Sequence, residues 1–296
     1  MYAIIWTESA QIFPATSIKP YRKSGTVIKG CPASGYGIKK KAENQNRGER
    51  KREDMRYGIF SDVHGNLEAM QRVREEYAKQ HIDAFVFLGD IVGYGANPKE
   101  TIALLRSLRG VCVAGNHDWA AAGKCPARRF NPCARTAIAW TAHQLSSAEK
   151  DFLARLPLLW IRPPASYAHA SVTNPAPFPY VLDENDAAAE FDNFEEPIGF
   201  IAHSHRSETY SVDRQGRVSR DTRQRIRLHP ECRYLVNAGS VGQPRDRDPR
   251  ACMCVYDTSA GEVVFFRIPY DTAAAAEKIY RAGLPRVLGD RLMKGC

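Results

Sequence analysis

The sequence predicts an α/β protein in which two mixed β-sheets pack against each other between outer layers of helices. From Met55 to about residue 114, short apolar runs alternate with segments whose apolar residues recur every three to four positions, which is typical of strands joined by helices. After residue 202, six apolar runs follow one another at hairpin spacing, which is typical of neighbouring antiparallel strands. Alternating strands followed by consecutive strands indicate two packed sheets flanked by helices.

The first half of this pattern predicts a parallel sheet. Asn66 is expected to cap a helix that extends to about Gln80, and Pro98 is expected to open a second helix in its first turn. Parallel strands joined by helices imply right-handed crossovers, so the loops at the carboxyl ends of the strands share one edge of the sheet. The expected strands are 57–60, 84–88 and 111–114.

The second half is expected to contain two helices, a proline-rich loop, a short acidic helix and then mainly strands, with a last helix that closes the chain. Ser146 or Ser147 is expected to cap the second of the two helices. The expected helices are 133–145, 147–156, 186–194 and 272–282, the loop is 173–182, and the strands are 166–168, 198–202, 207–212, 217–220, 223–228, 233–236, 251–257 and 262–268.

Residues 1–54 differ from the rest of the chain in charge and pattern. They contain 11 of the 42 Lys and Arg but only 5 of the 33 Asp and Glu, and they show no sustained apolar periodicity. This composition favours a disordered basic extension, and Met55 is the expected true start of translation, with a functional basic arm as the alternative. The domain is therefore expected at 55–296.

The remaining residues carry a net charge of only +3, so they do not predict a phosphate-backbone-binding surface or a stable nucleic-acid partner. The eight cysteines form no Cys-x-x-Cys pair, and no secretory signal or membrane helix is predicted. A reduced, cytoplasmic protein is therefore expected. Whether the chain forms a homo-oligomer is left open.

Carboxylate, amide and imidazole side chains recur at the ends of five predicted strands, and five of the eight histidines belong to this series. In an extended strand, residues two positions apart share a face, so an Asp-x-His pair can turn toward one cation. We expect the whole series to form one metal site. Its residues are Asp62 and His64 after the first strand, Asp90 after the second, Asn116, His117 and Asp118 after the third, His169 after the fourth, and His203 and His205 after the fifth.

This series resembles the motifs of the calcineurin-like metallophosphoesterases, from about Met55 to Tyr270. The stretches 89–95 and 237–246 are further similar to the small prokaryotic branch of predicted phosphodiesterases. The resemblance implies a four-layer α-β-β-α sandwich. The chain departs from the family at three alanines where glycine or proline is usual, and alanine is tolerated there if φ is negative. They are Ala170, Ala202 and Ala238.

The resemblance also implies two divalent metal ions, Mn(II) first and Fe or Zn as alternatives, because mixed imidazole and oxygen ligands suit these metals better than Mg or Ca. The carboxylate of Asp90 is implied as the bridge between them. The implied ligands are Asp62, His64, Asp90 and His205 for one ion, and Asp90, Asn116, His169 and His203 for the other.

The implied activity is hydrolysis of small phosphodiesters or phosphomonoesters, with nucleotides as one candidate class, by attack of a metal-bridged hydroxide. His117 is the implied general acid for the leaving oxygen, and Asp62 is its implied orienting partner. Tyr94, Asn97 and Arg245 are expected to contact the substrate.

Two further features lie near this series. The loop 173–182, which carries Phe178 and Tyr180, is the expected lid over the substrate. Asp118 is expected to cap the helix that follows it, with orientation of a neighbouring residue as the alternative.

Two other functions are kept as alternatives. A non-catalytic metal-binding scaffold on the same fold would be expected to lose ligands, whereas this chain has the complete set. A nuclease would need a broad basic groove, which the charge of the domain does not predict. The Asp-Arg-Gly extension of protein serine/threonine phosphatases is missing, since Ile91 follows Asp90, and this disfavours a protein phosphatase.

Overall fold

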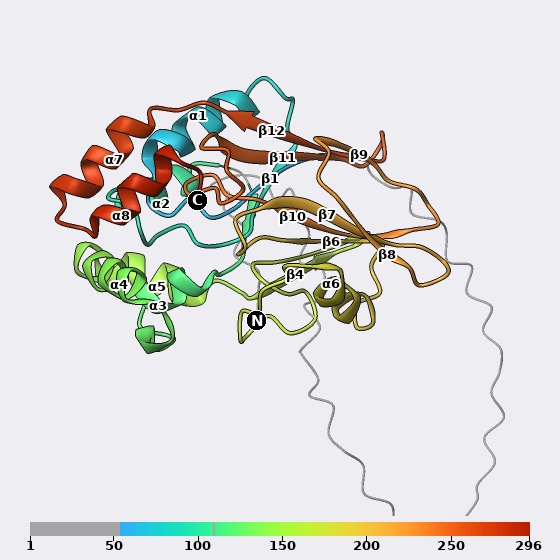
Figure 1. Cartoon of the computed structure of the whole chain (residues 1–296), viewed down its shortest axis with the longest axis horizontal. Helices are drawn as coiled ribbons and strands as arrows, with labels where there is room; N and C mark the ends of the chain where they lie inside the picture. The colour runs from blue at the N-terminus through green and yellow to red at the C-terminus, as the bar shows by residue number, and fades with distance from the viewer. Residues whose placement is uncertain (1–53, 109) are drawn as a thin grey trace, which may run out of the picture.

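Two six-stranded sheets lie face to face with helices on the outside in a computed structural model that describes residues 54–108 and 110–296 (Figure 1). The layered α/β architecture predicted above is confirmed. The predicted extension lies outside the described residues except for Asp54.

The first sheet has the strand order β3-β2-β1-β11-β12-β9. Its first three strands are parallel, as the crossover pattern predicts, and the other pairings are antiparallel. The strands are β1 (Arg56–Phe60), β2 (Ala84–Phe87), β3 (Gly110–Cys112), β9 (Arg225–Arg227), β11 (Ala251–Asp257) and β12 (Glu262–Ile268).

The second sheet has the strand order β4-β5-β6-β10-β7-β8. β5, β6 and β10 are parallel neighbours, and the edges of the sheet are antiparallel. The strands are β4 (Leu159–Arg162), β5 (Ala165–Ala168), β6 (Ile198–Ile201), β7 (Ser207–Val212), β8 (Val218–Asp221) and β10 (Arg233–Ala238).

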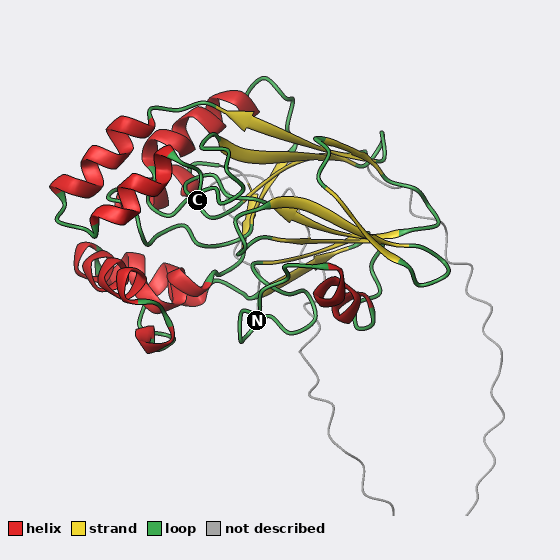
Figure 2. Cartoon of the chain, in the orientation of Figure 1, coloured by secondary structure: helices red, strands yellow, loops and turns green. Residues whose placement is uncertain are grey.

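Most helices gather at one end of the two sheets, while α6 lies against the outer face of the second sheet (Figure 2). The predicted caps form: Asn66 accepts a hydrogen bond from the N–H of Ala69, and Ser146 accepts one from the N–H of Glu149. The helices are α1 (Leu67–Tyr77), α2 (Pro98–Arg106), α3 (Asn116–Ala121), α4 (Pro132–Gln144), α5 (Ser147–Arg155), α6 (Glu184–Phe191), α7 (Thr272–Arg281) and α8 (Arg286–Asp290), with 3-10 turns η1 (Ala127–Arg129) and η2 (Arg291–Met293).

Alternation along the strands divides the core into an inner and an outer part. In β1, Ile59 points between the sheets, and Phe60 points toward the helices. Between the sheets, Phe200 of the second sheet contacts Tyr256 of the first, with ring centroids 5.3 Å apart. This packing holds the ends of β1, β2, β5 and β6 in fixed positions relative to one another, which is what a site shared by the two sheets requires.

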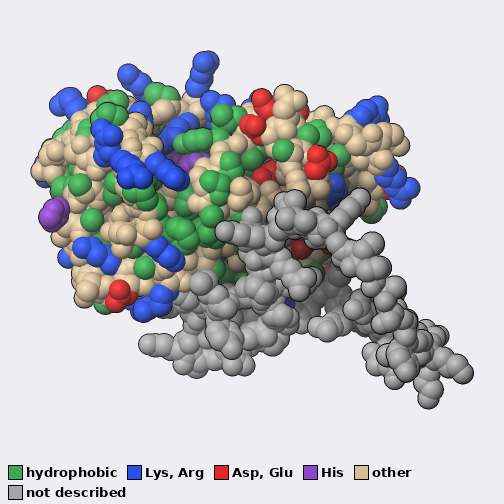
Figure 3. Space-filling view, turned by 90° about the horizontal axis from the view of Figure 1, so that it is seen from below, with side chains coloured by type: hydrophobic (Ala, Val, Ile, Leu, Met, Phe, Trp, Pro, Cys, Tyr) green, Lys and Arg blue, Asp and Glu red, His purple; other side chains and the backbone are tan. Residues whose placement is uncertain are grey.

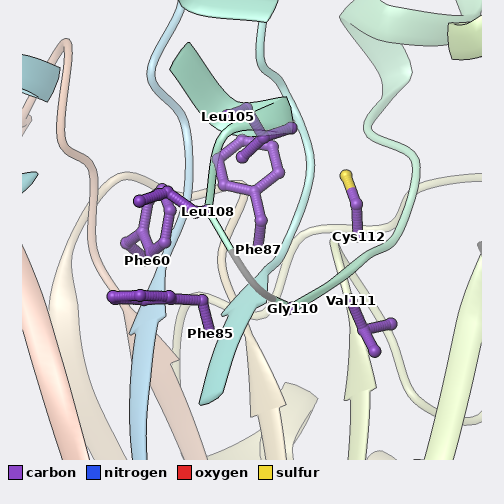
Figure 4. Close-up of a pocket in the computed structure, with 8 residues that line it drawn as sticks. All are labelled: Phe60, Phe85, Phe87, Leu105, Leu108, Gly110, Val111 and Cys112. Carbon is purple, nitrogen blue, oxygen red and sulfur yellow. The ribbon is translucent and has the colours of Figure 1, made fainter. Parts of the chain in front are cut away.

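Outside the first sheet, apolar side chains fill the space between the strands and helices α1 and α2. One small gap there has a volume of about 10 Å³. Figure 4 shows the residues that line it, among them Phe60, Phe87 and Leu105. A gap of this size and polarity belongs to the packed core and offers no polar group to a ligand.

Several elements differ from the predictions, among them α3, which begins at Asn116 rather than after Asp118. β4 was not predicted, α6 begins at Glu184 rather than 186, and α8 follows α7 although α7 was expected to close the chain. β4 and α8 are four and five residues long, too short to show a clear apolar period. Within the described part of the chain, no helix is both long and apolar enough to cross a membrane.

Candidate active site

The structure brings all seven predicted metal-ligand residues to one place, at the carboxyl ends of parallel strands of both sheets. They form a first donor group and a second donor group, which approach each other at the carboxylate of Asp90. The first donor group is Asp62, His64 and His205, and the second is Asp90, Asn116, His169 and His203.

The predicted ligand side chains converge for a different reason than the sequence suggested. β1 ends at Phe60, so Asp62 and His64 do not share a strand face; both have left-handed backbones, with φ of 50° and 49°. Asp90 and His205 also have positive φ. Left-handed non-glycine residues store strain and persist only where the surrounding structure holds them. The loops hold each other here, since the N–H of Asp62 donates to the Gly89 carbonyl at 3.0 Å.

Within the first donor group, the ligand atoms lie at short distances. Asp62 Oδ1 is 3.2 Å from His205 Nε2 and 3.6 Å from His64 Nε2. The two imidazole nitrogens are themselves 3.2 Å apart. Atoms at these distances from one another can all contact a cation placed between them.

The second donor group is equally close. His169 Nε2 is 3.1 Å from Asn116 Oδ1 and 3.1 Å from His203 Nδ1. Asp90 Oδ2 is 3.4 Å from His169 Nε2 and 3.7 Å from His64 Nε2 of the first donor group. Asp90 therefore lies between the two groups, where a bridging carboxylate would be needed.

The chemistry of the donors fits cations. The Nδ1 atoms of His64, His169 and His205 face the carbonyls of Val92, Leu88 and Gln243 at 3.1, 2.8 and 2.6 Å. A carbonyl only accepts hydrogen bonds, so each Nδ1 donates, and in the neutral form of each ring Nε2 keeps a lone pair that is aimed inward. Asp62 Oδ1, another acceptor, is buried with no hydrogen-bond partner among the described residues. Converging lone pairs without protons between them are what a metal ion satisfies.

Both carboxylates are held in the charged form. Burial alone would raise their pKa values, but His205 keeps the pKa of Asp62 well below its usual range, and His169 and His117 lower the pKa of Asp90. The same attraction raises the pKa of His169 to about 9 despite its burial. The carboxylates of Asp62 and Asp90 thus favour a positive charge next to them, where the imidazole nitrogens converge.

Asp118 does not act as the predicted N-terminal cap. α3 already begins at Asn116, with Gly115 at the cap position. The Asp118 carboxylate accepts the N–H groups of Asp90 at 2.8 Å, Ile91 at 2.9 Å and Gly115 at 3.0 Å. It therefore fixes the loop that carries Asp90, which corresponds to the alternative of orienting a neighbour. Its bond to Gly115 also helps to cap α3, from the third helical position rather than from the N-cap.

His117 lies beside the two donor groups. Its N–H donates to Asp90 Oδ1 at 2.8 Å, and its ring, only 3% exposed as a residue, contacts Tyr94 at 4.5 Å and Phe130 at 4.9 Å between centroids. Burial lowers the pKa of its imidazole well below the usual value. The ring nitrogens also come close enough to His64 and Asp90 to form a third potential ligand group.

The predicted orientation of His117 by Asp62 is not seen. In the described contacts, His117 Nδ1 has no hydrogen-bond partner. The Asp62 carboxylate instead faces His64, His205 and the N–H of His203, the last at 3.3 Å.

A cavity of about 260 Å³ opens onto these residues. Tyr94 and Arg245, two of the three predicted substrate contacts, line it, as does Arg129. Asn97 is not among its lining residues; it stands before α2, and its side chain accepts a hydrogen bond from Lys278 Nζ at 3.3 Å. In the face shown in Figure 3, a histidine side chain lies in a hollow between Lys and Arg side chains and hydrophobic ones.

One wall of the cavity belongs to the predicted lid, loop 173–182. Phe178 and Tyr180 line the cavity. The Tyr180 ring stacks on the ring of His203, with centroids 4.0 Å apart and planes at 16°. The lid role itself stays a prediction.

Another part of the cavity lining was missed by the sequence analysis. It comes from α3, which carries Trp119, and from the segment between α3 and α4, which carries Cys125, Phe130 and Asn131. None of these residues belongs to the predicted metal-ligand series, and the available signal is that they come shortly after the Gly-Asn-His-Asp motif.

The three alanines that depart from the family pattern do not force a left-handed backbone on a non-glycine residue. None of Ala170, Ala202 and Ala238 is among the described non-glycine residues with positive φ. Each can hold its position without glycine.

Comparisons with known proteins agree with this geometry. A profile of the calcineurin-like phosphoesterase superfamily domain matches residues 55–261. An uncharacterised protein of Methanocaldococcus jannaschii is 35% identical over 241 residues, covering 80% of this chain and 97% of the relative.

Two solved structures are similar to this chain. A metallophosphoesterase from Sphaerobacter thermophilus is 35% identical, with a TM-score of 0.73 over 82% of this chain and 100% of its own. A hypothetical protein from Pyrococcus horikoshii shares the fold at 18% identity, with a TM-score of 0.65 over 81% of this chain and 98% of its own. Together with the residues that converge in the site, these matches show that the chain belongs to the calcineurin-like phosphoesterase superfamily and is a metal-dependent phosphoesterase of the small prokaryotic type.

Proposed function

We propose that this protein is a dinuclear phosphoesterase that hydrolyses small phosphodiesters or phosphomonoesters, with nucleotides as one candidate class. The observation that carries the proposal is the position of Asp90, whose Oδ2 lies 3.4 Å from His169 Nε2 and 3.7 Å from His64 Nε2. One carboxylate that faces two donor groups is the arrangement that a pair of ions would share.

The seven converging side chains would hold the two ions, Mn(II) first and Fe or Zn as alternatives. When bound, such a pair of cations lowers the pKa of water and neutralises charge on the phosphate oxygens. The chain supplies the rest of the chemistry, which is orientation of the ester and transfer of a proton.

Arg245 is the proposed contact for the phosphate. Its Nη2 donates to Gln243 Oε1 at 3.0 Å, its guanidinium lies 5.8 Å from the centroid of the Tyr94 ring, and its Nε is buried without a hydrogen-bond partner among the described residues. A buried donor without a partner is costly, and an anionic oxygen in the cavity would satisfy it.

His117 is the proposed general acid. It lines the cavity, and its backbone bond to Asp90 fixes its distance from the shared carboxylate. Because burial lowers the pKa of His117, the ring would hold its extra proton only while an anionic ester in the cavity offsets that effect. A proton delivered from the ring to the leaving oxygen would then avoid expulsion of an alkoxide.

The cavity favours small substrates over the two alternatives. A volume of about 260 Å³ lies below the usual range of about 300–1,000 Å³ for ligand pockets, which suits a small ester better than a nucleic-acid strand. The complete ligand set disfavours a scaffold. A cytoplasmic location is part of this proposal, supported by the free cysteines of the described residues.

The proposal is tested by turnover of bis-p-nitrophenyl phosphate and p-nitrophenyl phosphate, with metal-stripped protein resupplied with Mn(II). Mn-dependent hydrolysis of either ester supports the enzyme, and the ratio of the two rates separates diesterase from monoesterase. Hydrolysis of neither ester by protein that has bound Mn(II) would contradict it.

A further inference from the structure

Helix α6 holds both ends of loop 173–182, the loop whose aromatic side chains form one wall of the cavity. Glu190 and Asp186 lie four residues apart, so their side chains share one face of the helix. Glu190 contacts the beginning of the loop, and Asp186 contacts its end.

The contacts at the beginning are dense. Glu190 is only 7% exposed, and its carboxylate accepts hydrogen bonds from the N–H of Val172 at 3.0 Å and from Thr173 Oγ1 at 3.0 Å. It also accepts a hydrogen bond from Ser171 Oγ at 2.5 Å, and Ser171 Oγ in turn accepts the N–H of Asn174 at 2.8 Å. A buried carboxylate surrounded by donors fixes this turn, which follows the proposed ligand His169 directly.

At the end of the loop, the N–H of Leu182 donates to Asp186 Oδ2 at 2.9 Å. The helix itself is anchored to the second sheet. Phe191 packs in its outer core, and Arg233 of β10 donates to the carbonyls of Phe191 at 2.9 Å and Phe194 at 2.5 Å. Both ends of the loop are thus tied to a fixed element.

Between these ends, two aromatic side chains reach the metal-ligand residues. Phe178 has a left-handed backbone with φ of 52°, and its ring lies 5.8 Å from Trp119 and 6.0 Å from His169 between centroids. Tyr180 stacks on His203 yet is 50% exposed, which leaves part of its ring accessible to a ligand. A strained residue at the centre of the loop requires support from the surrounding structure.

We propose that Glu190 and Asp186 are positioning residues that hold Phe178 and Tyr180 as a fixed aromatic wall, which selects esters whose retained group is a flat ring. The retained group is the one that stays on phosphorus after hydrolysis. This inference rests on the proposed phosphoesterase function for its substrate class. The structural part of the inference does not depend on turnover. This part is that Glu190 and Asp186 hold the two ends of loop 173–182, which we call the clamp.

The substrate test compares bis-p-nitrophenyl phosphate with methyl p-nitrophenyl phosphate, using the Mn(II)-loaded protein. The leaving group is the same in both esters, so the ratio of their kcat/KM values reports only the retained group. Glu190→Gln places an amide N–H₂ group among the N–H and O–H donors that surround Glu190. We expect this substitution to lower the ratio about two- to tenfold, the range expected when one aromatic contact is lost. Asp186→Asn should lower the ratio less, because it removes one contact.

Two comparisons separate positioning from general destabilisation. Glu195→Gln makes the same chemical change at an exposed glutamate after α6 and should leave the ratio unchanged. Tyr180→Leu should lower the ratio directly. The further decrease when Glu190→Gln is added to Tyr180→Leu should be smaller than the decrease that Glu190→Gln causes in the wild-type protein. Full additivity of the two substitutions, or a ratio unchanged by Glu190→Gln, would overturn the specificity role.

Amide hydrogen exchange tests the clamp itself. In Glu190→Gln, we expect faster exchange at residues 172–174 and in the rest of the loop, with unchanged exchange in β5 and β6 and an unchanged metal content. Unchanged exchange in the loop would overturn the clamp. If wild-type protein hydrolyses neither ester, the proposed function and the substrate selection fail together, while the exchange result still decides the clamp.

Discussion

The backbone N–H of His117 donates to Oδ1 of Asp90 at 2.8 Å, while the other oxygen of Asp90 faces the imidazole nitrogens of His64 and His169. One carboxylate therefore sets both the distance between the two donor groups and the position of the residue proposed as the acid. Because the contact uses the His117 backbone, substitution of its side chain leaves the shared carboxylate in place.

Asp90→Asn should remove metal and activity together. The amide carries no charge, and if its oxygen takes the place of Oδ2, its N–H₂ group meets the backbone N–H of His117, so one of the contacts of Asp90 is lost. We expect a loss of activity of at least about 100-fold, above the 10- to 100-fold typical of residues that only support ligands, with less than one metal ion retained per chain. Asp151→Asn, at an exposed position of α5, is the matched control. Full activity with two ions bound would disprove the bridging role.

His117→Ala should keep the metal but slow the reaction. Loss of a general acid costs about 100- to 10,000-fold where the leaving group is basic. We therefore expect a large decrease with phenyl phosphate and a small one with p-nitrophenyl phosphate, whose leaving group needs little protonation. Metal analysis decides between this role and ligation, because loss of an ion in His117→Ala would assign the imidazole to the third potential ligand group.

Arg245→Gln should weaken substrate binding without changing metal content. Hydrogen bonds to charged groups contribute about 1.5–3 kcal/mol, so kcat/KM should fall by about 10- to 100-fold. The exposed Arg128, which is outside the cavity lining, provides the control Arg128→Gln. Equal effects of the two substitutions would show that only the overall charge matters.

Gly115→Ala should impair the site without removing any ligand. A Cβ at this position would lie 2.0 Å from Asp90 Oδ1 and 2.3 Å from the Asp90 nitrogen, so the loop that carries Asp90 must move. We expect a decrease in Mn(II) affinity of at least about 10-fold, the lower bound for changes in residues that support ligands. Gly123→Ala is a comparison at a glycine where a Cβ meets no atom within 4 Å, although its positive φ of 76° carries its own strain. Wild-type affinity in Gly115→Ala would show that the loop tolerates the shift.

Most of the strands along the chain and the set of converging side chains could be predicted because both follow from local patterns. Asp90, His169 and His203 each come just after an apolar run, and parallel strands bring their carboxyl ends to one edge of the sheet. The detailed geometry could not be predicted. The left-handed backbones of Asp62 and His64 depend on hydrogen bonds to the loop after β2, which is distant in sequence.

The role of Asp118 and the contribution of Trp119 and Phe130 to the cavity were hidden for a similar reason. Asp118 stands where a helix cap is plausible, and only the fold shows that it accepts N–H groups 26 to 28 residues earlier in the chain. Trp119 and Phe130 form part of the cavity because α3 and α4 pack beside the strand ends. A single aromatic residue in a loop has no periodic signal that would indicate this position.

The most direct test of the dinuclear claim is a titration of metal-stripped protein with Mn(II), in which hydrolysis of bis-p-nitrophenyl phosphate and bound metal are measured on the same samples. With Asp90 shared between two donor groups, activity should remain low up to one bound ion per chain and rise to its maximum as the second ion binds. Full activity at one bound ion per chain would contradict the account.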